Sequence, residues 1–115
     1  MAKKREWTHE QERDIVRAAK DVFHHNTLSG DVIRVKSRYR KYVNTEAGTI
    51  DSDGYCAISF VVGRKKLILQ ATDVIWALHH DRLPYPTHVI KHLNGNRLDN
   101  RLDNLEEQRY TVLPS

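Results

Sequence analysis

The sequence predicts an α+β fold made of an N-terminal helix, a small antiparallel β-sheet of hairpins and a short central helix. The first observation is a stripe of apolar residues at helical spacing near the start of the chain. The second is a pair of segments, "YCAISFVV" and "RKKLIL", which are joined through Gly63 and are typical of a β-hairpin. The third is "ATDVIWALHH", whose apolar residues favour a short buried helix.

The N-terminal helix is expected from about Thr8 to His24. Thr8 and Gln11 have the spacing of a capping box, in which each side chain bonds the backbone of the other residue. The stripe that would face the core consists of Ile15, Ala19, Val22 and Phe23. The segment "HHNTLSGD" is rich in turn-forming residues, so the helix is expected to end there.

A basic segment, "DVIRVKSRYRKY", follows that turn and alternates between charged and apolar residues. The alternation predicts a strand with one charged face, which is either a solvated surface or a surface that contacts a polyanion. The basic residues of the segment are Arg34, Lys36, Arg38, Arg40 and Lys41, and a second group consists of Arg64, Lys65 and Lys66. The chain carries 19 basic and 15 acidic side chains, and the clustering of the basic ones predicts one strongly positive surface.

The second half of the chain is expected to hold one helix and two strands. "ATDVIWALHH" is predicted to be capped by Thr72 and to be ended by Pro84 and Pro86. Its candidate core residues are Val74, Ile75 and Leu78. "THVIKHLNG" predicts a strand that runs into a loop rich in asparagine, and "LDNLEEQRYTVL" predicts a turn back into a last strand before Pro114.

The histidines do not form a convincing metal site by spacing alone. His88 and His92 lie four residues apart, which suits ligands on a helix, but their segment is predicted to be a strand, where that spacing exceeds about 12 Å. The pairs His24–His25 and His79–His80 are both expected at helix ends, where an imidazole meets the carbonyl dipole.

Composition limits the class of protein. A chain of 115 residues supports one domain with one core, so residues 1–115 are expected to form a single unit. Apolar runs such as "VIWAL" are too short to cross a bilayer, and "MAKKREWTHEQ" lacks the apolar stretch of a secretory signal. One cysteine, Cys56, cannot form an internal disulfide. No membrane association and a cytoplasmic location are therefore expected.

A succession of motifs between Leu28 and Leu105 resembles the HNH endonucleases of phages, especially the homing type. The motifs are "SGDVIRVKSR", "AGTIDSDGY", "RKKLIL", "VIWALHHDRLP" and "KHLNGNRLDNRLDNL", in the order found in that family. The resemblance implies a ββα-metal fold that recognises DNA and, in active members, cuts it with one divalent cation. It divides the chain into an N-terminal helix (1–27), a basic β-rich part that contacts DNA (28–70) and an HNH-like part without its final helix (71–115). It also implies a cytoplasmic protein of a bacterial host cell, encoded by a phage or mobile element.

The residues that match the family's active site indicate a degenerate member. The family's Asp-His pair is Lys91-His92 here, so the general base survives as His92 while the acid is lost. Asn104 matches the asparagine that orients the base. The second family ligand falls on Leu113, close to Pro114 and Ser115, and Asn94 replaces a further aspartate. The family's usual His-Arg ahead of the central helix is likewise replaced, by Thr72 and Asp73.

No metal ligand is therefore assigned, and no cofactor is expected. Protonated lysine has no lone pair to offer a cation and repels it. Mg²⁺ or Mn²⁺ would be needed only for residual nuclease activity. With both ligands missing, His92 and Asn104 are expected to be a vestigial base and its vestigial orienting residue.

The resulting hypothesis is a DNA-binding protein without nuclease activity that acts as a regulator, such as a repressor, of a phage or mobile element. Phosphate contacts are assigned to the two basic groups above, with Lys91, Arg97 and Arg101 continuing them at the asparagine-rich loop. The expected partner is double-stranded DNA, with a homodimer as a plausible assembly. One alternative is a scaffold that inhibits a host or phage protein. Another is an active HNH nickase whose unusual metal site uses His92 and Asp99.

Overall fold

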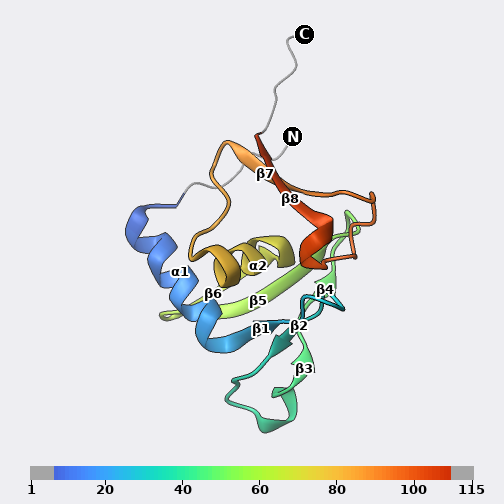
Figure 1. Cartoon of the computed structure of the whole chain (residues 1–115). Coiled ribbons are helices and arrows are strands. Elements are labelled where there is room, and N and C mark those ends of the chain that lie inside the picture. The colour runs from blue at the N-terminus through green and yellow to red at the C-terminus, as the bar shows by residue number, and fades with distance from the viewer. Residues whose placement is uncertain (1–6, 110–115) are drawn as a thin grey trace.

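The computed structural model of the protein describes residues 7–109 (Figure 1). The α+β class predicted from the sequence is confirmed, because two helices accompany three small antiparallel sheets, in the orders β1-β2-β3, β4-β5-β6 and β7-β8. The elements in chain order are α1 (His9–Val22), β1 (Phe23–His25), β2 (Val32–Arg34), η1 (Arg40–Tyr42), β3 (Thr45–Glu46), β4 (Thr49–Ile50), β5 (Cys56–Val62), β6 (Lys65–Gln70), α2 (Ala71–His80), β7 (His88–His92), η2 (Leu102–Asn104) and β8 (Leu105–Arg109).

Helix α1 begins as predicted and ends earlier than predicted. Thr8 is the N-cap, and its side chain and that of Gln11 form both hydrogen bonds of a capping box. The helix stops at Val22 because Phe23 turns to extended geometry and enters a strand that pairs with β2. The expected helix end at His24 and His25 is therefore wrong, and both histidines lie on β1. Burial of Phe23 against the ring of Phe60 favours the strand, since a continued helix would carry that ring elsewhere.

The basic segment is only briefly a strand. Strand β2 ends at Arg34, residues 35–39 have no regular structure, and η1 follows. The predicted strand with one continuous charged face is therefore wrong. Strand β2 pairs with β1 on one side and with only two residues of β3 on the other, so no partner strand extends along the remainder of the segment.

The predicted hairpin is confirmed as β5 and β6. The two strands pair in register from Ala57–Gln70 to Val62–Lys65, and Gly63 takes the positive φ of 65° that the tight turn requires. Strand β4 adds to the other edge of β5. The sheet positions Ile58 and Phe60 toward the core and leaves Ile68 exposed on the opposite face.

Helix α2 is the central element of the core. Val74 and Ile75 are fully buried as predicted, whereas Leu78 is only partly buried. Figure 1 shows α2 above β5 and β6 with α1 alongside, and both helices contact β5. The predicted cap at Thr72 is wrong, because Gln70 is the N-cap and Thr72 is buried within the first turn.

The helix also ends differently from the prediction. Asp81 adopts the left-handed conformation (φ 56°), and its N–H donates to the carbonyl of Ala77. Helix α2 therefore ends at His80, ahead of Pro84 and Pro86. His79 and His80 occupy the last helical turn, as predicted.

Strands β7 and β8 form a separate two-stranded ribbon that leads away from the core (Figure 1). Both predicted strands of this region are confirmed, with β8 described up to Arg109. Leu113, Pro114 and Ser115, on which the sequence reasoning about a missing ligand and helix relied, lie outside the described residues. Among residues 7–109, no helix is both long and apolar enough to span a membrane.

Candidate functional site

The β7–β8 ribbon is fixed to helix α2 through one carboxylate. Glu107 of β8 accepts hydrogen bonds from Arg82, at 2.6 Å for the closest nitrogen, from the indole of Trp76 at 3.2 Å and from the backbone N–H of Tyr85 at 3.1 Å. Only 12% of its side chain is exposed. The hydrogen bonds from the Arg82 guanidinium are the main cause that lowers the pKa of Glu107 to about 2, so this carboxylate is ionised and fixed in place.

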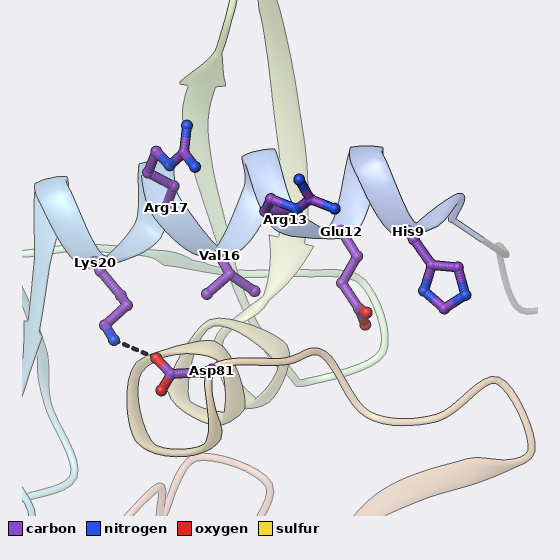
Figure 2. A pocket seen from close by; sticks show the side chains of 7 residues that line it. All are labelled: His9, Glu12, Arg13, Val16, Arg17, Lys20 and Asp81. Carbon is purple, nitrogen blue, oxygen red and sulfur yellow. Dashed lines mark hydrogen bonds and ion pairs between the residues drawn. The ribbon is translucent and has the colours of Figure 1, made fainter.

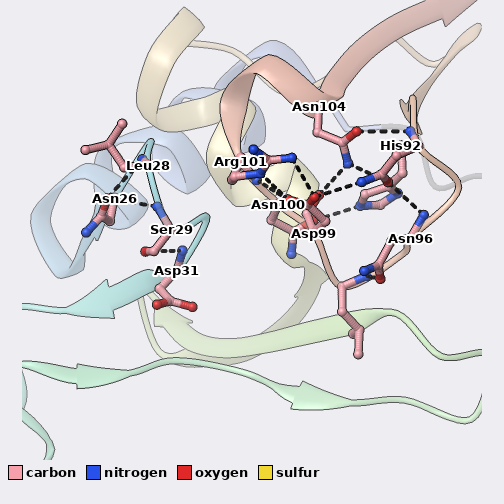
Figure 3. A network of polar contacts seen from close by, with 12 residues as sticks. Asn26, Leu28, Ser29, Asp31, His92, Asn96, Asp99, Asn100, Arg101 and Asn104 are labelled. Atoms are coloured by element: carbon pink, nitrogen blue, oxygen red, sulfur yellow. Dashed lines mark hydrogen bonds and ion pairs between the residues drawn. The ribbon is translucent and has the colours of Figure 1, made fainter.

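The loop between the two strands, residues 93–104, is the asparagine loop. Asn104 stabilises it from within: its Oδ1 accepts from Asn94 N–H at 3.0 Å and its Nδ2 donates to Asn94 Oδ1 at 3.0 Å and to the Asp99 carbonyl at 2.8 Å. Asn96 Oδ1 in turn accepts from the N–H of Leu98. Figure 3 shows Asn104 beside Asp99 and Asn100 in this loop. Asparagine side chains therefore satisfy backbone groups of their own loop.

His92 is buried at the end of β7, and its Nε2 lies 2.8 Å from Asn100 Oδ1. The expected contact between His92 and Asn104 is not formed, because all the hydrogen bonds of the Asn104 side chain go to Asn94 and Asp99. Asn104 is thus placed to shape the loop, and Asn100 contacts the imidazole. Asn100 was missed by sequence reasoning because its neighbours in the loop are of the same chemical type.

A cleft of about 580 Å³ opens where the ribbon meets the asparagine loop. Its lining includes Lys91, His92, Arg97 and Tyr55. The Arg97 guanidinium lies 4.7 Å from the centroid of the Tyr55 ring and donates to the carbonyl of Asp53 at 2.6 Å. Arg109 also lines the cleft. Tyr55 and Arg109 were not predicted, and only the position of Tyr55 just after the Asp51–Gly54 turn hinted at a place beside the loop.

The donor groups of this cleft do not fit a divalent cation. Lys91 brings an ammonium group, and Asp99 is already engaged, with one oxygen 2.8 Å from Arg101 Nε and the other 2.8 Å from Asn94 Nδ2. The hydrogen bonds from Arg101 lower the pKa of Asp99 to about 2. Within residues 7–109, no three His, Cys, Asp or Glu side chains gather in a metal-binding arrangement. No reaction step is therefore derived through a metal.

The predicted basic residues are distributed over several elements. Arg34 is half-buried, donates to the carbonyl of Ser59 at 3.0 Å and lies over the Phe23 ring, so it supports the fold. Lys36 pairs with Asp21 at 3.0 Å. The exposed members of the first group are Lys36, Arg38, Arg40 and Lys41. The structure therefore gives one of the five predicted residues, Arg34, a structural contact, while Lys36 makes an exposed ion pair.

The second basic group and the loop arginines also differ in their surroundings. Arg64 lies in the β5–β6 turn, and Lys65 and Lys66 are exposed at the start of β6. Arg97 faces the cleft with Lys91, whereas Arg101 lies against Asp99 within the loop. Arg97 and Lys91 are therefore the two predicted cations that the structure brings together at one site.

Comparison with protein families finds a match for part of the chain. A family model described as HNH endonuclease matches residues 72–108, which span α2, β7, the asparagine loop and most of β8. This segment, which makes up less than half of the chain, is therefore similar to the HNH endonuclease family. A comparison with curated protein sequences finds no match.

A solved structure shares the fold. It is described as "DNA binding and cleavage by the HNH homing endonuclease I-HmuI", and the similarity has a TM-score of 0.60 at 21% sequence identity. The alignment covers 82% of this chain and 50% of that chain, so this chain spans about half the length of the homing endonuclease. The resemblance to HNH endonucleases drawn from the sequence is confirmed by the family match over residues 72–108 and by the shared fold.

Proposed function

We propose that this protein binds double-stranded DNA at the cleft beside the asparagine loop and does not cleave it. The observation that carries the proposal is the place of Lys91, which directly precedes His92 on β7 and lines the same cleft, at the position where active family members have an acid. A lysine at that position supplies a permanent positive charge for a phosphodiester, so the cleft attracts the DNA backbone without a metal ion. DNA binding by the homing endonuclease that shares the fold supports the same partner.

The surrounding residues extend this attraction. Arg97 is held by the Tyr55 ring and by the Asp53 carbonyl, so little side-chain entropy remains to be lost when it contacts a phosphate. The exposed groups Arg38, Arg40 and Lys41, and Arg64, Lys65 and Lys66, provide further phosphate contacts that position the duplex without reading its sequence.

Salt-dependent binding to a duplex tests the proposal directly. Replacing Lys91 with alanine should weaken binding and reduce the slope of log K against log salt by about one, because one phosphate contact is lost. Lys20→Ala is the matched control, since Lys20 lies on α1 and pairs with Asp81 (Figure 2), and neither residue lines the cleft. An unchanged salt slope for Lys91→Ala would overturn the proposal that this side chain contacts DNA.

The variant Lys91→Asp tests whether the lysine ammonium takes the place of a metal ion in binding DNA. This variant restores the acid beside His92, so it should bind DNA more weakly than Lys91→Ala in EDTA and regain affinity when Mg²⁺ is added. The wild-type protein should lose affinity on addition of Mg²⁺, through counterion competition alone. A wild-type protein that requires Mg²⁺ for binding would contradict the proposal.

The absence of cleavage is tested with supercoiled plasmid in Mg²⁺ or Mn²⁺. The plasmid should remain intact, and His92→Ala should change nothing. Nicking that His92→Ala abolishes would instead establish the nickase alternative.

Loss of cutting with retained binding suits a regulator, such as a repressor, of a phage or mobile element. A homodimer would let such a regulator contact two half-sites. Sedimentation with and without duplex measures that assembly, and a stoichiometric protein partner without DNA affinity would favour the inhibitor alternative.

A further inference from the structure

The asparagine loop is in contact with a distant part of the chain, the turn between β1 and β2. We call residues 26–31 the hairpin turn. It is a rigid element, because Asn26 Oδ1 accepts from the N–H groups of Leu28 and Ser29, and the Ser29 hydroxyl accepts from Asp31 N–H. Figure 3 shows the hydrogen bonds of this turn and, separately, those of the asparagine loop.

The approach of the two segments is close enough to exclude a side chain. Gly30 has a φ of +85°, and a Cβ built on it would lie 2.6 Å from the backbone nitrogen of Arg101 and 2.7 Å from the carbonyl carbon of Asn100. Such short distances would be steric clashes, and they could not be relieved by moving a flexible side chain, because the contacting atoms of Asn100 and Arg101 belong to the backbone. The hairpin turn and the asparagine loop are therefore packed backbone to backbone.

One buried imidazole joins the two segments by hydrogen bonds. His25 of β1 is 5% exposed, and its Nε2 lies 2.8 Å from the carbonyl oxygen of Asn100. Asn100 is itself 6% exposed, and its side-chain oxygen lies 2.8 Å from Nε2 of His92. A single residue of the loop thus connects His25, through its backbone, with His92, through its side chain.

The acceptors fix which ring nitrogens carry hydrogen. A carbonyl oxygen only accepts, so His25 must donate from Nε2 and, when neutral, accept at Nδ1. His79 Nε2 lies 2.9 Å from that Nδ1 and must donate to it. The side-chain oxygen of Asn100 likewise requires His92 to carry hydrogen on Nε2. The donor of each hydrogen bond in this series is therefore defined. His79 donates to His25, His25 donates to the carbonyl of Asn100, and His92 donates to the side-chain oxygen of Asn100.

We propose that His25 is a positioning residue for the candidate site: through Asn100, it fixes the asparagine loop and the orientation of His92. The part of the protein that matches the HNH endonuclease family begins at residue 72, so this contact brings the N-terminal region into the site from outside that module. The hydrogen-bonded imidazole holds the loop in one conformation without any bound ion. The consequence for DNA affinity rests on the proposed function, whereas the effect on the loop does not.

Two variants of His25 and one of its neighbour test the proposal. His25→Leu removes the donor and leaves the Asn100 carbonyl buried without a partner. His25→Gln retains an amide N–H near the position of Nε2, so it should restore the contact. His24→Leu is the matched control, because His24 is exposed and lies on the same strand.

The first measurement is amide hydrogen exchange. His25→Leu should accelerate exchange in residues 93–104 by about tenfold or more relative to the β5–β6 sheet, as expected when one buried hydrogen bond is lost. His25→Gln and His24→Leu should exchange like the wild type. Equal acceleration of the loop and the sheet, or no acceleration, would overturn the proposal, because a residue needed only for overall stability changes both regions together.

The second measurement uses the wild-type protein alone and is independent of how any variant folds. The ring nitrogen chemical shifts should show His25 and His92 protonated at Nε2 in their neutral forms. A neutral His92 protonated at Nδ1 would overturn the proposed hydrogen bond from His92 Nε2 to the side-chain oxygen of Asn100. Duplex affinity should decrease for His25→Leu and recover for His25→Gln. If none of the proteins binds DNA, the proposed function fails while exchange and ring shifts still decide the role of His25.

Discussion

The carboxylate of Glu107 should be the largest single polar contribution to the stability of the β7–β8 ribbon. Its ordinary pKa of 4.5 is lowered to about 2, chiefly by the hydrogen bonds that Arg82 donates. Since one pKa unit corresponds to about 1.4 kcal/mol, the ionised group contributes about 3 kcal/mol to the free energy of unfolding at pH 7. Because the pKa is lower in the folded chain, the contribution is complete above about pH 4.5 and is lost as the pH falls toward 2.

Replacing Glu107 with glutamine should therefore have a pH-dependent effect. The variant should lose about 3 kcal/mol at pH 7 and about 1.4 kcal/mol at pH 3, where most of the wild-type contribution has already disappeared. Urea denaturation followed by circular dichroism at both pH values measures the two differences. Glu106→Gln is the matched control, because Glu106 is the exposed neighbour on the same strand and should change stability by less than about 0.5 kcal/mol.

Two results would refute this reasoning. One is a difference between wild type and Glu107→Gln that stays constant from pH 7 to pH 3, since a constant difference would mean that lost packing and not lost charge is responsible. The other is an equal effect of Glu106→Gln. Asp99, whose pKa is also lowered to about 2, is present in all three proteins and therefore does not affect the comparison.

Three further substitutions test the packing described above. Gly30→Ala should destabilise the protein by more than Gly54→Ala, which should cost only about 1–2 kcal/mol: both glycines have positive φ, but a Cβ meets backbone only at Gly30 and open space at Gly54. Equal losses in urea denaturation would contradict the close approach. Ile58→Ala should cost about 2–5 kcal/mol because its side chain is fully buried, while Ile50→Ala, on an exposed side chain, should be near neutral. Thr8→Ala should cost about 1 kcal/mol through loss of the capping box, and a thermal scan without a shift would show that the cap is dispensable.

Local patterns were sufficient to predict most of the elements. The capping box at Thr8, the hairpin through Gly63 and the buried face of α2 each depend on residues within one or two turns of the chain, so the sequence records them directly. The element boundaries that were wrong depend on partners elsewhere. Helix α1 ends at Val22 because Phe23 packs on Phe60, a contact that periodicity does not reveal.

The candidate site was predictable in its components and not in its connections. Lys91 and His92 were found because they occupy the positions of a known motif, and Arg97 was found because it lies in the same loop. His92 contacts Asn100 and not Asn104, because the loop folds back so that the Asn104 side chain bonds the Asp99 carbonyl. Tyr55 enters the cleft only because the turn after β4 lies beside the loop, as the hydrogen bond from Arg97 to the Asp53 carbonyl shows.

By itself, the sequence predicted the α+β class and the HNH-like segment that the family match covers, since these depend on residue type and order. Only the tertiary structure decided that Arg34 makes a structural contact, that Lys91 and Arg97 share one cleft, and that His25 reaches the asparagine loop. The physical reason is that hydrogen bonds and packing act over a few ångströms in space, and residues 25 and 100 are brought within that distance only by the complete fold.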